Sequence, residues 1–192
     1  GYLGNGSSPW RLQDPDNLPE IDIPVANHTH IKDGKFMPYL RDDKLSRPWA
    51  VPGQKGFQHR IGGLSKENET GNVSYDPDNN QLMIGLREQK VENIADFIPE
   101  QKIKAGAESG ELLVLGWGST YGVLISAVSE CYSQGYSVGF THLRYLRPFP
   151  RNLEKLFSNY QKILIPELNN GQLIKIIREK YDVNAIGMNK VQ

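Results

Sequence analysis

The residues best placed to do chemistry follow an apolar run at residues 112–115. They are Gly116, Gly118, Ser119 and Thr120. An apolar run without polar alternation is typical of a parallel strand that is buried on both faces. The glycines predict a tight turn, and either hydroxyl residue would cap the following helix rather than act in catalysis. The free N–H groups of that helix would face one spot, which predicts a site for a ligand or a small anion.

The same segment lacks part of a dinucleotide-binding fingerprint. The pattern G-x-G-x-x-G requires a third glycine where Tyr121 stands. The next expected strand ends in His142, whereas the fingerprint requires an acidic residue there. A structural turn is therefore favoured over a nucleotide-using enzyme, which remains one alternative.

Further polar residues follow two other expected strands. Glu167 could be a general base, or it could bind the free N–H groups of a neighbouring helix. Asn169 or Asn170 would cap that helix. Arg144 and Arg147 could hold a carboxylate or a phosphate, or they could pair with an acidic group on another domain.

Two other polar groups lie in the N-terminal part of the chain. His28 and His30 form an H-x-H pair, but no carboxylate or cysteine cluster stands near them at metal-ligand spacing, so a metal site is disfavoured. His59, Arg60 and Glu67 form the other group, and the glycines between them indicate a shaped loop.

The composition excludes several classes of protein. The 192 residues contain 22 Lys and Arg and 22 Asp and Glu, so no overall charge attracts nucleic acid or a membrane surface. The apolar runs are too short to span a bilayer, and no signal peptide is evident, so we expect a cytoplasmic protein. Cys131 is the only cysteine, and its helical spacing predicts a buried, inert thiol.

Strands and helices are expected to alternate after residue 110. The pattern predicts strands at residues 112–115, 136–143, 162–166 and 183–188, with helices after 119, at 152–160 and at 172–181. This alternation implies an α/β fold with three layers and a doubly wound, mostly parallel sheet. A strand order of 2-1-3-4 would bring the loops 116–120 and 167–171 to one crevice, with Arg144 and Arg147 at the same edge.

The composition changes near residue 78. Residues 1–77 are rich in Pro, Gly, Asn and Asp, so we expect a long irregular arm, and residues 78–192 would form the α/β domain. The domain would begin with a helix that ends before Pro99. Trp10, Trp49 and Phe57 are costly to expose, which suggests that a neighbour covers part of the arm.

Six segments, in order along the chain, resemble the alpha subunit of 2-oxoacid:ferredoxin oxidoreductases. They are HRIGGL at 59–64, TGNVSYDP at 70–77, VLGWGST at 114–120, HLRYLRP at 142–148, PELNNGQL at 166–173 and GMNKVQ at 187–192. The resemblance is greatest to the 2-oxoglutarate-type, CoA-dependent branch. It implies that residues 78–192 are a transketolase C-terminal-like domain and that residues 1–77 follow a pyrimidine-binding domain.

The resemblance implies chemistry for a whole complex rather than for this chain. Such enzymes decarboxylate a 2-oxoacid on thiamine diphosphate, pass electrons through iron–sulfur clusters to ferredoxin and form an acyl-CoA. Thiamine diphosphate, Mg and the clusters are implied for the complex, and no cofactor is expected in this chain, which lacks the corresponding motifs. The implied partners are the chain's own pyrimidine-binding domain, the beta subunit, ferredoxin and CoA.

The role implied for the chain is to hold subunits together, and alone it should be inactive. Its start at residues 1–3 reads as the inside of a strand, so a fragment is expected. His59, Arg60 and Glu67 would then lie near the active site of the full enzyme. The alternative is a free-standing α/β module that binds a small anion.

Overall fold

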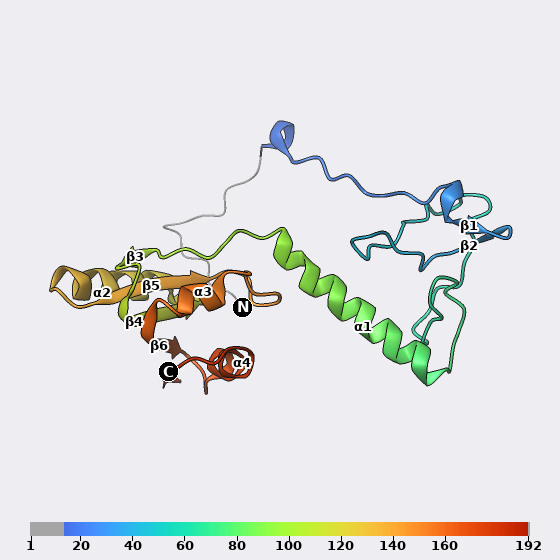
Figure 1. Cartoon of the computed structure of the whole chain (residues 1–192). Coiled ribbons are helices and arrows are strands. Elements are labelled where there is room, and N and C mark those ends of the chain that lie inside the picture. Colours follow the sequence, from blue (N-terminus) through green and yellow to red (C-terminus); the bar gives the residue numbers. More distant parts are fainter. Residues whose placement is uncertain (1–13, 192) are drawn as a thin grey trace. The chain divides into compact units, whose positions relative to one another are not determined.

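The computed structural model describes residues 14–191, and its contacts divide the chain into two compact units (Figure 1). The units are Gly1–Met83 and Ile84–Gln192, so the division falls inside helix α1, Pro77–Asn93. The boundary at residues 77 and 78 remains a prediction. Trp10 and the strand expected at residues 1–3 lie outside the described part. Within that part, no helix is long and apolar enough to cross a membrane.

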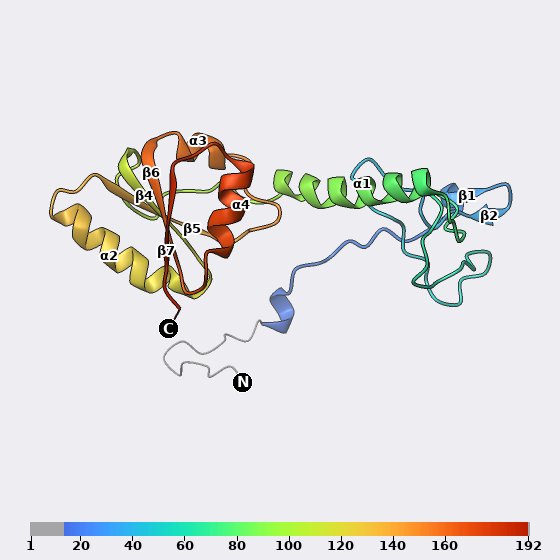
Figure 2. The ribbon, with the colours of Figure 1, turned by 90° about the horizontal axis from the view of Figure 1, so that it is seen from below.

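The second unit is built on a five-stranded sheet with the order β3-β5-β4-β6-β7 (Figure 2). The strands are β3 Ala105–Gly106, β4 Gly110–Trp117, β5 Val138–Leu143, β6 Tyr160–Glu167 and β7 Ala185–Asn189. The pairs among β5, β4, β6 and β7 are parallel. The predicted order 2-1-3-4 is therefore correct for these four strands.

Helices cover both faces of this sheet, as the α/β prediction requires. Helix α2, Tyr121–Ser133, packs through Val128 against Val114 and Phe140. Helices α3, Leu153–Phe157, and α4, Gln172–Lys180, pack on the opposite face around Leu113 and Leu115. Neighbouring residues of β4 thus contribute to two cores, which explains its unbroken apolar run. The strands lie between the two sets of helices (Figure 2).

Two expectations for this unit are corrected. The first strand was expected at residues 112–115, but an antiparallel edge strand, β3, precedes it, and in this strand Ala105 pairs with Phe140. A two-residue strand carries too little periodicity to be seen in the sequence. Cys131 is exposed rather than buried, because the apolar contacts of α2 end with Val128 and the last turn of the helix has no core beneath it.

The first unit is largely irregular, as predicted, but it has a small core of its own. It contains the short helices η1 Pro15–Asn17 and η2 His28–His30, and a hairpin of β1 Ile31–Lys32 and β2 Lys35–Phe36. Ala26, Phe36 and Phe57 form the core, so Phe57 needs no external cover. Trp49 is 65% exposed, and its cover by a neighbour stays a prediction.

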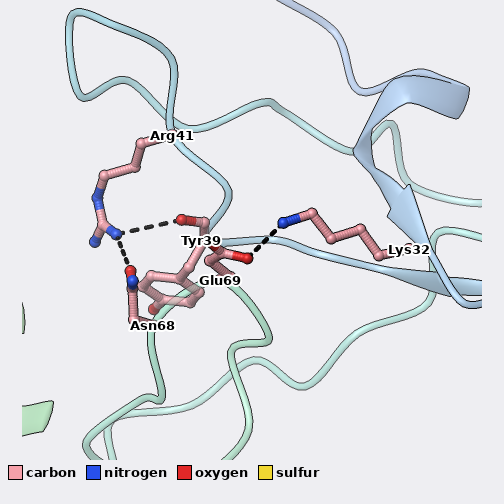
Figure 3. A network of polar contacts seen from close by, with 5 residues as sticks. All are labelled: Lys32, Tyr39, Arg41, Asn68 and Glu69. Atoms are coloured by element: carbon pink, nitrogen blue, oxygen red, sulfur yellow. Dashed lines mark hydrogen bonds and ion pairs between the residues drawn. The ribbon is translucent and has the colours of Figure 1, made fainter.

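Polar contacts fix the loop after this hairpin (Figure 3). Lys32 Nζ lies 2.6 Å from a carboxylate oxygen of Glu69. Arg41 donates to Asn68 Oδ1 at 2.8 Å and to the carbonyl of Tyr39 at 3.2 Å. The contacts to Asn68 and Glu69 join segments far apart in the sequence, and they hold the loop that leads into α1. Polar contacts therefore add to the small apolar core in ordering the irregular arm.

Two glycine-to-alanine substitutions should have opposite effects on the free energy of unfolding. An added Cβ at Gly139 would lie 2.3 Å from the Tyr160 hydroxyl and 2.4 Å from the Ala107 carbonyl oxygen, whereas nothing lies within 4 Å of one at Gly122. We expect Gly139→Ala to cost about 1–3 kcal/mol through overpacking. Gly122→Ala in α2 should gain up to about 1 kcal/mol. Urea unfolding measures both, and a neutral Gly139→Ala would mean that β3 does not cover β5 in this way.

Candidate functional site

The first candidate site lies where the sheet order reverses, between β4 and β6. A cavity of about 180 Å³ is lined there by both loops that were expected to meet; its residues are Trp117, Gly118, Ser119, Thr120, Glu167, Leu168 and Asn169. Gly116 lies just before it at the end of β4 and is buried. A Cβ on Gly116 would come within 2.7 Å of Leu124, so this glycine allows α2 to pack closely. The structure thus brings together the predicted residues of β4 and β6.

Glu167 is the buried centre of this region, at 2% exposure. Its carboxylate accepts hydrogen bonds from the backbone N–H of Leu173 at 2.9 Å and of Ile174 at 3.1 Å. The indole N–H of Trp117 donates to it at 3.3 Å. The carboxylate thus occupies the free N–H groups and the positive dipole end of α4. Of its two predicted roles, the contacts support the electrostatic partner rather than a free general base.

The two helix starts near this cavity differ. Gly171 stands at the N-cap of α4, so Asn169 is not the capping residue that was expected; its Oδ1 instead accepts from the N–H of Gly171 at 2.8 Å and of Gln172 at 3.0 Å, just before and at the start of the helix. For α2 the expectation is also wrong. Thr120 stands at the N-cap, but its hydroxyl donates backward to the Trp117 carbonyl at 2.8 Å, and no side chain caps the helix.

The backbone of Gly118 explains this difference. Gly118 has φ +62° and begins the 3₁₀ turn η4, Gly118–Thr120. Thr120 therefore enters α2 with helical angles, φ −80° and ψ −3°, instead of the extended angles that a capping residue adopts. Ser119 is exposed on the same turn. The Thr120 hydroxyl therefore bonds to the turn before the helix, and neither residue caps α2 as residue type had suggested.

A second, larger cavity lies on the other side of Gly118, beside β5. It measures about 800 Å³, and its lining includes Lys102, Lys104, Tyr121, His142 and Arg144. Of these, sequence reasoning selected only Arg144 as a site residue. The alternation of Lys102, Ile103 and Lys104 was the available signal, because it places both lysines on one side of an extended segment.

Arg147 lies outside both cavities, although it shares a loop with Arg144. Its guanidinium lies 3.5 Å from a carboxylate oxygen of Glu88 in α1, and both side chains are largely exposed. The sequence could not separate the two arginines, since it does not show which one faces α1. Arg147 therefore pairs with an acidic group, but that group lies in the same unit and not on another domain as predicted.

His142 is the titratable group at the floor of the larger cavity. Its Nε2 lies 3.1 Å from the carbonyl oxygen of Gly118, and its ring packs edge-on against Tyr121 at a centroid distance of 5.2 Å. Burial lowers the pKa of His142, hydrogen bonds to the carbonyls of Gly118 and Trp117 oppose that shift, and the charges of Arg144 and Lys104 lower the pKa further. The imidazole is therefore neutral near pH 7.

The residues predicted in the first unit do not form one cluster. His59 Nδ1 bonds to the Phe57 carbonyl at 2.9 Å, Glu67 accepts from the Thr70 hydroxyl, and Arg60 is exposed. Among residues 14–191, no group of three His, Cys, Asp or Glu side chains could hold a metal ion. The role of this loop stays a prediction.

Replacing Glu167 should lower stability more than its single charge suggests. In Glu167→Gln, the amide NH₂ would face N–H donors, leaving at least one buried donor unsatisfied, at a cost of about 1–3 kcal/mol. Glu179→Gln, on the exposed side of α4, is the matched control and should stay within about 0.5 kcal/mol of the parent. Urea unfolding of both variants measures the difference. Equal stabilities would show that Glu167 does not hold α4.

The depressed pKa of His142 should appear in both its titration and the stability of the fold. The unfolded chain binds a proton near pH 6.5 and the folded chain does so only at lower pH, so stability should be complete above pH 6.5 and fall below it. The His142 ring resonances in an NMR titration measure the pKa directly. Arg144→Gln should raise that pKa by removing a nearby positive charge. A midpoint above 6.5 in the parent chain would contradict this electrostatic description.

The comparisons with known proteins agree with this geometry. The family model described as pyruvate:ferredoxin oxidoreductase core domain II matches residues 110–191. The 2-oxoglutarate oxidoreductase subunit KorA of Mycobacterium tuberculosis is 42% identical over 194 residues, covering 100% of this chain and 29% of the relative. The alpha subunit of 2-oxoacid:ferredoxin oxidoreductase 1 of Aeropyrum pernix is 31% identical over 151 residues, covering 75% of this chain and 23% of the relative.

A solved structure extends the agreement to three dimensions. The 2-oxoglutarate:ferredoxin oxidoreductase of Magnetococcus marinus, solved with 2-oxoglutarate, coenzyme A and succinyl-CoA bound, gives a TM-score of 0.81 at 25% identity. The match covers 94% of this chain and 31% of that chain. The chain thus spans less than a third of the length of these relatives. The resemblance found in the sequence is confirmed: the chain is a homologue of the alpha subunits of 2-oxoacid:ferredoxin oxidoreductases and carries their core domain II at residues 110–191.

Proposed function

We propose that this chain is the C-terminal part of the alpha subunit of a thiamine-diphosphate-dependent 2-oxoacid:ferredoxin oxidoreductase in the cytoplasm. The reaction would be the oxidative decarboxylation of a 2-oxoacid, such as 2-oxoglutarate, to an acyl-CoA. The observation that carries the proposal is the 42% identity to the Mycobacterium tuberculosis subunit, because it extends over the whole chain. The ligands of the Magnetococcus marinus enzyme support a CoA-dependent reaction.

The proposed complex needs cofactors that require particular sets of ligating side chains. Its single cysteine supplies one thiolate, whereas an iron–sulfur cluster generally takes four. The part of the chain that the structure describes has no cluster of metal-ligating side chains for Mg either. We therefore assign thiamine diphosphate, Mg and the clusters to other parts of the complex.

The role proposed for the chain is structural and subunit-contacting. The turn at Gly118 and Ser119 and the loop at Asn169 lie at one edge of the sheet, where α/β folds meet ligands or partners. Glu167 would not contact the partner; it would fix the loop that leads into α4. Residues 1–77 would connect to a pyrimidine-binding domain, and the loop with His59, Arg60 and Glu67 would approach the active site formed with the beta subunit.

A free-standing module that binds a small anion is the second candidate. The cationic lining of the larger cavity favours it, since Lys102, Lys104 and Arg144 gather there. The two candidates differ in whether the chain must assemble with another protein to function. Assembly is therefore the property to test.

The chain alone should neither bind thiamine diphosphate nor reduce a viologen dye with 2-oxoglutarate and CoA. The full-length alpha subunit, mixed with the beta subunit, should do both, because only that assembly supplies the missing cofactor sites. Calorimetry and dye reduction under anaerobic conditions measure these properties. Stoichiometric, Mg-dependent binding of thiamine diphosphate by the chain alone would contradict the assigned role. Failure of the full-length pair to turn over any 2-oxoacid would contradict the reaction itself.

A further inference from the structure

The larger cavity of the second unit combines charge with aromatic surface. Its volume of about 800 Å³ lies within the range of small-molecule sites. The half-exposed rings of Tyr121 and Tyr145 line it together with His142. Planar side chains of this kind offer stacking surface to a ring-containing ligand. The cavity therefore offers a ligand both positive charge and flat aromatic surface.

The wall that carries the lysines is held firmly against β5. The N–H of Lys104 donates to the Phe140 carbonyl at 2.7 Å, and the buried Thr141 hydroxyl donates to the Lys102 carbonyl at 2.9 Å. Gln101 adds a side-chain hydrogen bond to Thr141 at 2.7 Å. The backbone of this segment is thus fixed before any ligand arrives, which lowers the entropic cost of binding.

The same segment is fixed from its other side by α3. Asn152, at the N-cap of α3, accepts from the Gln101 N–H at 2.8 Å and donates to the Gln101 carbonyl at 2.8 Å. This reciprocal pair joins the start of the wall to the helix on the opposite face of the sheet. One helix, α3, and one strand, β5, therefore position the segment that carries the lysines.

The charges in the cavity favour an anion. Lys102, Lys104 and Arg144 line it, and within residues 14–191 none of their side chains has a hydrogen bond or an ion pair. Glu100 is the one carboxylate in the lining. Burial is the main cause of the lowered pKa of His142, and the positive charges of Arg144 and Lys104 lower it further, so both cations act on this part of the cavity.

We propose that this cavity binds a nucleoside diphosphate group, with the diphosphate against Lys102, Lys104 and Arg144 and the base against the tyrosines. The group could come from a free nucleotide or from a coenzyme that contains one, such as CoA. The site differs from a dinucleotide-binding turn, because its cations come from the segment before β3 and from the loop after β5. The inference does not depend on the proposed enzymatic function, since the chain's own residues form the cavity.

Calorimetry and an amide NMR titration of the 192-residue chain with Mg-free ADP test this proposal. Saturable binding should shift the resonances of Lys104, His142 and Tyr145, and it should raise the pKa of His142 as the phosphates offset the local charge. Arg144→Gln and Lys104→Gln should each weaken binding about tenfold, as expected for a lost charge-assisted hydrogen bond. Glu100→Gln should tighten binding by removing a repulsive charge.

Arg147→Gln is the matched control, because it removes the same charge from the same loop but outside the cavity. It should change the affinity by less than about twofold at 0.15 M salt, where distant charges are screened. Adenosine and pyrophosphate, titrated separately, should each bind more weakly than ADP. Tighter binding of CoA than of ADP would identify a coenzyme as the source, and equal binding would identify a free nucleotide.

Three results would overturn the proposal. They are the absence of saturable ADP binding up to millimolar concentrations, equal effects of Arg144→Gln and Arg147→Gln, and resonance shifts confined to residues outside the cavity. The variants are on the surface, so thermal unfolding should confirm that each remains folded. A failure here leaves the proposed function standing, because that proposal rests on assembly with the beta subunit.

Discussion

The carboxylate of Glu167 lies buried where β6 ends, and three N–H groups from two other segments converge on it. A buried carboxylate is costly unless hydrogen bonds compensate for the lost hydration. The fold supplies them from Leu173 and Ile174 in α4 and from the Trp117 indole at the end of β4. This requirement ties the two central strands and one helix together at the point where the sheet reverses.

The two cavities on this edge follow from that arrangement and from Gly118. Gly118 lines both of them, and its positive φ sets the direction in which α2 leaves the sheet. The smaller cavity is bounded by Glu167, whose charge is already used within the fold. The larger one presents cations without a carboxylate partner among the residues described. The turn at Gly118 therefore separates the Glu167 carboxylate, which is hydrogen-bonded within the fold, from the cations of the larger cavity.

The sequence was sufficient where local signals decide the structure. The unbroken apolar run of β4 and the regular alternation that follows were enough to predict the parallel sheet and its order. The sequence was insufficient where contacts with segments distant in the chain determine the local structure. Strand β3 exists only because Ala105 and Gly106 pair with β5. The capping of α2 was predicted wrongly because one backbone angle at Gly118, rather than residue type, determines where the Thr120 hydroxyl points.

The candidate site shows the same division. Glu167 and Asn169 were recognisable because a polar residue between a buried strand and a helix has few possible roles. Lys104 and His142 were not recognised as one site, since segments far apart in the sequence meet only through the edge pairing of the sheet. The burial of Cys131 was predicted wrongly, because helical spacing shows which side of α2 the residue is on but not how far along the helix the sheet covers that side.

The most direct test of the central claim is amide hydrogen exchange at the first turns of α4 and α2. First-turn amides normally have no partner within their own helix and exchange rapidly. With Glu167 in place, Leu173 and Ile174 should exchange as slowly as residues of the sheet core, whereas Gly122 and Val123, in a helix without a side-chain cap, should exchange quickly. Rapid exchange at Leu173 and Ile174, equal to that at Gly122, would show that the carboxylate does not hold the helix.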